Sequence, residues 1–148
     1  MPFTPPVRRF LSSRDPAQLL HAIVDTREVV TGRVDVSPPT ERLQLSVVAL
    51  KEGASVSPHI HQPREKSSSQ LPFLTQESWI VLRGGINVRL YDENGNFIAV
   101  EKLAAGQLLV SFHGGHAFDQ AELNTVIIEC KNGPYEGRDY SLIEDLPT

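Results

Sequence analysis

Two of the chain's five histidines stand two positions apart, in the stretch "GASVSPHIHQPRE" that runs from residue 53 to residue 65. In an extended strand, residues two positions apart point to the same face, so the imidazoles of His59 and His61 can bind one ion between them. An isolated pair of this kind also suits two solvated histidines at a strand end. The spacing therefore raises a metal-site hypothesis that depends on the elements around the pair.

Those elements have the pattern of β-strands. From residue 42 onward, apolar residues alternate in short runs that are separated by turn residues. We expect strands in the segments RLQLSVVAL, INVRLYD, FIAVEKL, GQLLVSF and NTVIIEC, and a hairpin turn at Asn94-Gly95. Short strands at this spacing, with almost no helix after the first quarter of the chain, predict an all-β sandwich or closed barrel.

The residues before the barrel are expected to form an arm and one helix. Residues 1–14 carry three prolines among the first six positions and predict an extended N-terminal arm. Residues 15–25 predict a short N-terminal helix, because Asp15 can cap it, Pro16 suits its first turn, and the apolar residues that follow share one face. The remainder divides into a barrel core at 42–131 and a C-terminal tail at 132–148, all within one domain at 1–148.

Composition narrows the classes of function. The 148 residues suit one domain, and 14 basic against 18 acidic residues give a formal net charge of −4 without a long run of either sign. We therefore expect a small-molecule ligand and no nucleic acid. No segment is apolar over the length of a bilayer and none resembles a signal peptide, so we expect no membrane association and a cytoplasmic protein.

The histidine pair belongs to a longer pattern. Gly53, His59 and His61 match the opening of the first cupin motif, and "ESWIVLRG" matches its close, with six residues between Glu77 and Gly84. The stretch "GQLLVSFHGGH" is similar to the second cupin motif. The chain thus resembles the cupin superfamily, which implies an all-β, cupin-type double-stranded β-helix, or jelly-roll barrel, with a divalent metal inside it.

Carried over residue by residue, the resemblance implies that the metal ligands are His59, His61, Glu77 and His116. The chain departs from the family pattern in two places: the segment 62–76 is inserted before Glu77, and the second motif is one residue short, with Phe112 where the family usually has proline. We expect the inserted loop to be mobile without ligand.

Two alternative ligands follow from these departures. Glu65 has the family's spacing from His61, but it is followed by "KSSSQLP", which has no strand pattern, whereas Glu77 begins an apolar strand that can hold its carboxylate rigidly. We therefore prefer Glu77. His113 is the second choice after His116.

Longer phrases, including "LLHAIV", "TQESWIVLRG" and "ECKNGPYEGRDY", are similar to small single-domain bacterial cupins found beside genes for surface-polysaccharide and sugar-nucleotide synthesis. That group has no established reaction. The resemblance implies an RmlC-like barrel and a homodimer in which the N-terminal arm crosses to the partner.

Three imidazoles and a carboxylate suit a divalent transition metal, namely Fe, Mn, Ni, Co, Cu or Zn. Four protein ligands leave open positions on a six-coordinate ion, where a small polar molecule such as a sugar derivative can bind. Three functions stay open: a metal-dependent isomerase or oxygenase, a non-catalytic binding protein, and a metal-free sugar-nucleotide epimerase with a histidine base and a tyrosine acid.

Other polar residues have weaker claims. Arg64, Arg83, His113 and Tyr135 are candidate substrate-binding residues at the mouth of the barrel, as is Lys66, and solvated side chains explain them equally well. We expect Trp79 to pack on the outer face of its strand or at an interface.

Overall fold

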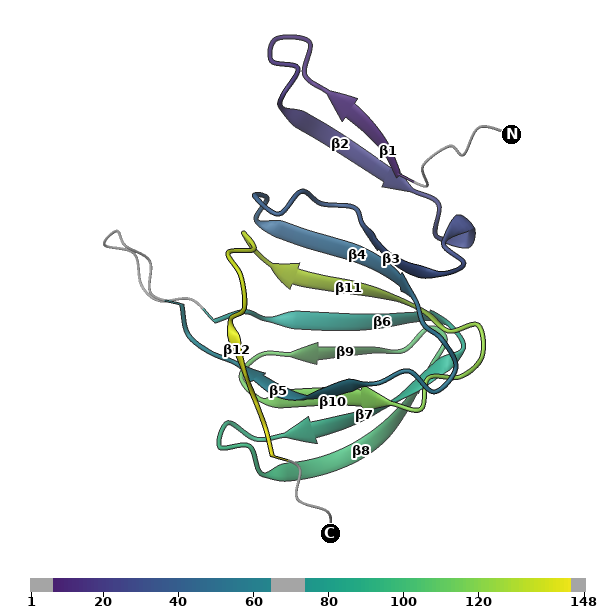
Figure 1. Cartoon of the computed structure of the whole chain (residues 1–148), viewed down its shortest axis with the longest axis vertical. Helices are drawn as coiled ribbons and strands as arrows, with labels where there is room; N and C mark the ends of the chain where they lie inside the picture. Colours follow the sequence, from purple (N-terminus) through teal and green to yellow (C-terminus); the bar gives the residue numbers. More distant parts are fainter. Residues whose placement is uncertain (1–6, 65–73, 145–148) are drawn as a thin grey trace.

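The structure of the chain is a computed structural model that describes residues 7–64 and 74–144. Its described residues form β-strands and one 3-10 turn (Figure 1). The elements are β1 (Val7–Leu11), β2 (Leu19–Val24), η1 (Thr26–Glu28), β3 (Gly32–Asp35), β4 (Leu43–Ala49), β5 (Val56–His61), β6 (Glu77–Arg83), β7 (Gly85–Tyr91), β8 (Phe97–Ala104), β9 (Leu108–Ser111), β10 (Gly115–Asp119), β11 (Val126–Asn132) and β12 (Tyr140–Leu142).

Two five-stranded antiparallel sheets form the body of the molecule. One has the strand order β12-β5-β10-β7-β8 and the other the order β3-β4-β11-β6-β9. Each sheet mixes strands from distant parts of the sequence, as a jelly roll requires. The predicted all-β architecture is therefore confirmed, including the hairpin of β7 and β8, in which Gly95 adopts a φ of +83° at the turn.

The space between the sheets is apolar at one end. Its core contains Trp79, Val81, Ile86, Val88, Phe118, Ala121 and Ile127. Because side chains alternate along a strand, the inner face of β11 presents Ile127 at the apolar end and then Glu129 and Lys131, which line a pocket. The other end of the barrel is accordingly polar.

The outer face of the β3-β4-β11 sheet is covered by the N-terminal segment. Val47 and Val126, which are at most 2% exposed, pack in a second cluster with Val7 and Val29. In Figure 1 the hairpin of β1 and β2 stands at the end of the molecule beyond β4. The N-terminal segment therefore packs on the outer face of this sheet, whereas the inner face of the sheet lines the pocket.

The predicted helix at 15–25 is wrong. Residues Leu19–Val24 form strand β2, which pairs with β1 along most of its length. Asp15 accepts a hydrogen bond from the amide of Ala17 as the helix prediction required, but it stabilises a turn, and the amide of Ser12 then bonds the carbonyl of Gln18 to close a hairpin. Pairing with β1 satisfies the backbone groups that a helix would have satisfied internally.

Within the predicted arm at 1–14, residues Val7–Leu11 form strand β1. The predicted tail at 132–148 contributes strand β12, which pairs with β5 so that Tyr140 lies opposite His61. The expected mobility of the loop 62–76 concerns mainly residues 65–73, which lie outside the described residues. In the described part of the chain, no helix has the length and apolar character needed to cross a membrane.

Candidate metal centre

Four side chains from three strands meet inside the barrel. His59 and His61 come from β5, Glu77 from β6 and His116 from β10, and each of the four is at most 9% exposed. One potential ligand atom from each lies within 4.8 Å of those of the others. The structure therefore brings together all four residues that the cupin resemblance implies as ligands, in a cluster that could bind a metal.

Strand geometry explains the convergence. His59 and His61 project from the same face of β5, and His116 is the cross-strand partner of His59, with ring centroids 4.5 Å apart. Glu77 reaches them from the opposite sheet, where its Oε2 accepts hydrogen bonds from His61 Nε2 at 3.1 Å and His116 Nε2 at 2.8 Å.

The other ring nitrogens of the pair on β5 have acceptors of their own. His59 Nδ1 lies 2.8 Å from the carbonyl oxygen of Ser57, and His61 Nδ1 lies 3.4 Å from Asp139 Oδ1. An acceptor at Nδ1 holds a proton there, so Nε2 is the atom that would bind a metal; in His61 it would do so after losing the proton that it donates to Glu77. Asp139 is itself fixed by Thr75, whose hydroxyl donates to its Oδ2, and by Arg64 at 3.3 Å.

The electrostatics of the cluster follow from its burial and its hydrogen bonds. Burial favours the protonated form of Glu77, but the hydrogen bonds from His116 and His61 outweigh it and hold the pKa of Glu77 well below its usual range. Burial lowers the pKa of His59. Burial also acts to lower the pKa of His61, but the hydrogen bond and charge of Glu77, with the charge of Asp139, raise it overall.

The donor set fits a divalent transition metal. Two imidazole nitrogens approach one oxygen of an ionised carboxylate in a site almost without solvent, and three neutral imidazoles with one carboxylate suit Fe, Mn, Co, Ni, Cu or Zn alike. A cation at this point would satisfy the charge of Glu77 and the lone pairs of the histidines together.

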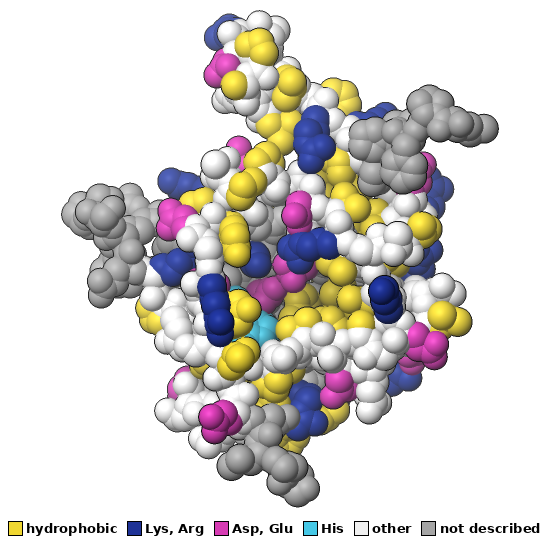
Figure 2. All heavy atoms as spheres, viewed as in Figure 1, with side chains coloured by type: hydrophobic (Ala, Val, Ile, Leu, Met, Phe, Trp, Pro, Cys, Tyr) yellow, Lys and Arg dark blue, Asp and Glu magenta, His cyan; other side chains and the backbone are white. Residues whose placement is uncertain are grey.

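The cluster opens into a pocket of about 820 Å³. Figure 2 shows histidine and acidic side chains deep in a hollow that faces the viewer, with basic side chains around it. His59, His61, Glu77 and Trp79 belong to its lining, together with residues of β3, β11 and the C-terminal tail. This volume is in the range of small-molecule sites.

The expected outward position of Trp79 is wrong. Trp79 is 2% exposed, and its ring packs edge-on against His116 at 4.8 Å and Phe118 at 5.1 Å between ring centroids. It lies two residues after Glu77 on β6, so both side chains point into the barrel.

Comparisons with known proteins identify the architecture. No family model matches the sequence, and no curated protein matches it. A Klebsiella pneumoniae protein described as having a double-stranded beta-helix domain is 16% identical, with a TM-score of 0.57 over 83% of this chain and 92% of that chain. The chain has a cupin-type fold.

Two further solved structures share this fold. KdgF from Halomonas sp. is 20% identical, with a TM-score of 0.50 over 68% of this chain and 77% of that chain. Oxalate decarboxylase from Bacillus subtilis is 20% identical, with a TM-score of 0.53 over 76% of this chain but only 27% of that chain. At these identities the likeness establishes the cupin fold alone.

The remaining predicted site residues are dispersed over the cupin barrel. Tyr135 lines the pocket and is 52% exposed. Arg64 donates to the carbonyl oxygen of Pro134 at 2.9 Å and to the hydroxyl of Thr75 at 3.0 Å, so it joins the tail to the start of β6. Arg83 bonds the carbonyl oxygen of Val29 at the other end of β6, and His113 is exposed; neither belongs to the pocket lining. Glu65 and Lys66 lie outside the described residues.

Several residues that line the pocket of the cupin barrel were not predicted from the sequence. Arg33, Glu129, Lys131, Asp139 and Tyr140 all line it. Alternation along β11 places Glu129 and Lys131 on the same face as Ile127, and this signal was available in the sequence. The positions of Asp139 and Tyr140 depend on a tail strand that has no clear pattern of its own.

Proposed function

We propose that this chain is a metal-binding protein that acts on, or binds, a small polar molecule. The metal would be a divalent transition ion held by His59, His61, Glu77 and His116. The observation that carries the proposal is the convergence of these four ligand atoms within 4.8 Å at the floor of an open pocket.

The residues of the chain have distinct parts in this proposal. The ion, when bound, would supply a Lewis acid that polarises an oxygen of the ligand. His59 and His61 would be oriented by Ser57 and Asp139, and Trp79 would keep water from one side of the centre. Residues of the tail, including Tyr140, would form the opposite wall of the pocket.

A metal-free epimerase is the second candidate. The observation that favours it is the position of Tyr140, whose ring centroid lies 5.0 Å from that of His59 and whose side chain lines the same pocket. A histidine base and a tyrosine acid are the groups that such a reaction requires. A non-catalytic binding protein would use the same metal centre and pocket without turnover.

Metal content tests the proposal directly. We expect about one transition ion per chain after purification without chelator, and a clear loss of bound metal in both His59→Ala and His61→Ala. The melting temperature of each variant should fall as well, because a ligand that binds the native state stabilises it by mass action. The exposed His113 provides the matched control, and His113→Ala should keep its metal.

Unchanged metal stoichiometry in both variants would refute the ligand assignment. A wild-type protein that contains no metal and binds none on titration would leave the metal-free epimerase as the candidate. If the protein does bind metal, assays of the metal-loaded protein for isomerisation or oxygen consumption would separate a catalyst from a binding protein.

We also propose that the ligand is sugar-derived and that the protein acts in surface-polysaccharide synthesis as an RmlC-like homodimer. The resemblance to small bacterial cupins supports both ideas. Exposed apolar side chains on the hairpin of β1 and β2, among them Phe10, Leu11 and Leu20, support the dimer. Light scattering on purified protein at several concentrations tests it: a mass of one chain throughout would refute the dimer.

A further inference from the structure

Opposite the histidines, the pocket wall consists of polar side chains in register. Asp35, Ser46, Glu129 and Trp79 are successive cross-strand partners on β3, β4, β11 and β6. A second row lies two residues farther along each strand, nearer the mouth of the pocket. It consists of Gln44 on β4, Lys131 on β11 and Glu77 on β6. The second row ends at the carboxylate of the metal centre, so the polar wall and the metal centre form one continuous surface.

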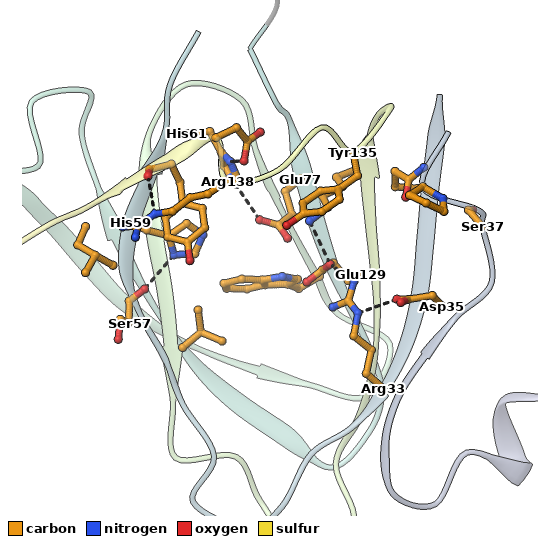
Figure 3. A pocket seen from close by; sticks show the side chains of 18 residues that line it. Arg33, Asp35, Ser37, Ser57, His59, His61, Glu77, Glu129, Tyr135 and Arg138 are labelled. Carbon is orange, nitrogen blue, oxygen red and sulfur yellow. Dashed lines mark hydrogen bonds and ion pairs between the residues drawn. The ribbon is translucent and has the colours of Figure 1, made fainter. Parts of the chain in front are cut away.

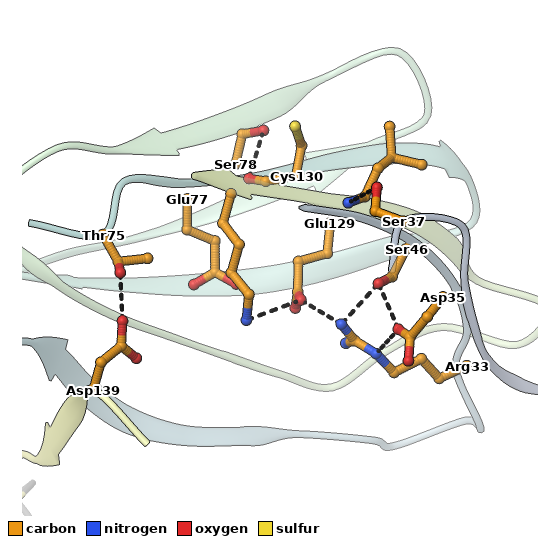
Figure 4. A network of polar contacts seen from close by, with 12 residues as sticks. Arg33, Asp35, Ser37, Ser46, Thr75, Glu77, Ser78, Glu129, Cys130 and Asp139 are labelled. Carbon is orange, nitrogen blue, oxygen red and sulfur yellow. Dashed lines mark hydrogen bonds and ion pairs between the residues drawn. The ribbon is translucent and has the colours of Figure 1, made fainter. Parts of the chain in front are cut away.

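Charges alternate along this wall. Arg33 donates to Asp35 Oδ1 at 2.7 Å and to Glu129 Oε1 at 2.8 Å, and it also bonds the hydroxyl of Ser46 (Figure 4). Figure 3 shows Glu129, Arg33 and Asp35 across the pocket from His59 and His61. Arg33 is thus occupied by partners within the protein and holds Glu129 in place.

Lys131 differs from Arg33 in this respect. Its Nζ forms an ion pair with Glu129 Oε1 at 3.6 Å, which is beyond hydrogen-bond distance, and a cation-π contact with the Tyr135 ring at 5.6 Å from the centroid. Within the described residues this ammonium group makes no hydrogen bond, although its side chain is only 22% exposed. An ammonium group that makes no hydrogen bond within the protein and borders an open pocket is placed to donate to a bound ligand.

Glu129 offers the complementary group. Its side chain is 15% exposed and lines the pocket, and its Oε1 receives Arg33 whereas Oε2 has no hydrogen-bond partner among the described residues. An ionised carboxylate only accepts hydrogen bonds. Its free oxygen therefore suits a donor such as a hydroxyl group of the ligand.

The total charge of the lining indicates the charge of the ligand. Arg33, Lys131 and Arg138 face the four carboxylates of Asp35, Glu77, Glu129 and Asp139 around the pocket. Arg64 also pairs with Asp139 at 3.3 Å, so a divalent ion would leave the loaded pocket with a net positive charge. An anionic ligand is therefore favoured over a neutral one.

We propose that Lys131 and Glu129 form a recognition subsite for a small anionic hydroxycarboxylate. Lys131 donates to the ligand's carboxylate next to the metal centre, and Glu129 accepts from a hydroxyl group farther along the wall. Arg33 acts as a positioning residue that fixes Glu129. This inference rests on the proposed function, because the metal supplies the charge that favours an anion.

The test compares three probes of similar length on the metal-loaded protein. D-gluconate carries a carboxylate and hydroxyl groups, D-glucitol has the hydroxyl groups without the carboxylate, and hexanoate has the carboxylate without hydroxyl groups. Calorimetric titration should give an affinity for gluconate at least tenfold higher than for either of the others.

The variants separate the two contacts. Lys131→Met should lower the affinity for gluconate at least tenfold and leave that for glucitol unchanged, whereas Lys131→Arg should keep gluconate binding within about threefold. Glu129→Gln should reduce the preference for gluconate over hexanoate. Lys51→Met, at an exposed turn position, is the matched control and should bind as wild type does.

Metal content is measured on every sample, so the two proposals can fail separately. Metal-loaded protein that binds no gluconate, or binds it equally well in the Lys131→Met and Glu129→Gln variants, would overturn the subsite and leave the metal centre intact. Protein that takes up no metal on titration and still binds gluconate through Lys131 would retain the subsite and refute the metal-dependent function.

Discussion

Asp139 connects the C-terminal tail to the metal centre. It accepts from His61 Nδ1 on one side, and on the other it is held by Arg64 and by Thr75, whose contact Figure 4 shows. Because Thr75 and Arg64 flank the undescribed residues 65–73, this carboxylate joins the tail, both ends of the inserted loop and one ligand. A carboxylate behind a ligating histidine fixes the ring and raises its basicity.

Loss of this carboxylate should therefore weaken metal binding without removing a ligand. We expect Asp139→Ala to lower metal affinity by about 10- to 100-fold, measured by competition with a chelator of known affinity. Asp119→Ala, on β10, is the control and should bind metal as wild type does. Equal affinities in the Asp139 variant and the wild type would show that His61 needs no such support.

The carboxylate of Glu77 should make the metal-free protein sensitive to acid. Its pKa in the folded state is well below the ordinary value of 4.5, so the unfolded chain binds the extra proton first as the pH falls. The contribution of Glu77 to the free energy of unfolding is then complete above pH 4.5 and is lost as the pH falls toward the folded-state pKa.

Urea unfolding of metal-free protein between pH 6 and pH 3 measures this effect. Glu77→Gln cannot ionise, so its stability should decline less steeply below pH 4.5 than that of the wild type. Parallel curves for the two proteins would mean that the hydrogen bonds from His61 and His116 do not favour the ionised form.

Single residues were predictable from the sequence where a motif or a strand pattern fixed them. The set His59, His61, Glu77 and His116 followed from motif spacing, and the strand after Glu77 decided against Glu65. Asp139, Lys131 and Tyr140 were missed as pocket residues, because their positions depend on pairings between segments that are distant in the sequence.

At the scale of elements, the turn between β6 and β7 is the most constrained connection. Gly84 has a φ of +69°, and a Cβ there would collide with both the side chain and the backbone of Thr125. Thr125 is fully buried and its hydroxyl receives the amide of Gly85 at 3.1 Å, so it cannot move away easily. Packing against Thr125 therefore requires a glycine at position 84, the last residue of the first cupin motif.

Substitution of Gly84 should lower the free energy of unfolding more than substitution of a glycine that has open space around it. Gly106 has a φ of +86° with no atom near its missing Cβ, so Gly106→Ala should destabilise by about 1 kcal/mol from backbone strain alone. Gly84→Ala should cost about 3 kcal/mol or more, because overpacking is added to the strain. Similar unfolding free energies in urea for the two variants would contradict this account.

Strands β4, β7, β8, β9 and β11 were predictable because their inner and outer faces differ, whereas β3, β12 and the N-terminal hairpin were not predicted as strands. In β2, Leu20 and Ile23 are about half exposed and Leu19 and Val24 are partly buried, so the apolar residues do not alternate cleanly. The same residues share one face of a helix, and tertiary pairing with β1 decided the outcome.

At the scale of the whole molecule, the single tryptophan lies beside the metal centre, with its ring centroid 4.8 Å from that of His116. All tryptophan fluorescence therefore originates in the pocket. Addition of Co²⁺ or Ni²⁺ should quench the emission with one-site saturation, because ions with unfilled d shells quench indole emission at short range. Glu77→Gln should require a much higher metal concentration. An emission unchanged by metal that is shown to be bound would place the ion elsewhere.

The central claim is that one metal ion lies between the two sheets at the histidine cluster. Anomalous scattering from crystals of the purified protein, recorded on both sides of the absorption edge of the metal found in it, tests this claim most directly. The account predicts one strong anomalous peak per chain, about 2.0–2.3 Å from a nitrogen of His59, His61 and His116 and from an oxygen of Glu77. A metal-loaded crystal with its peak at other residues, or with none in the barrel, would contradict it.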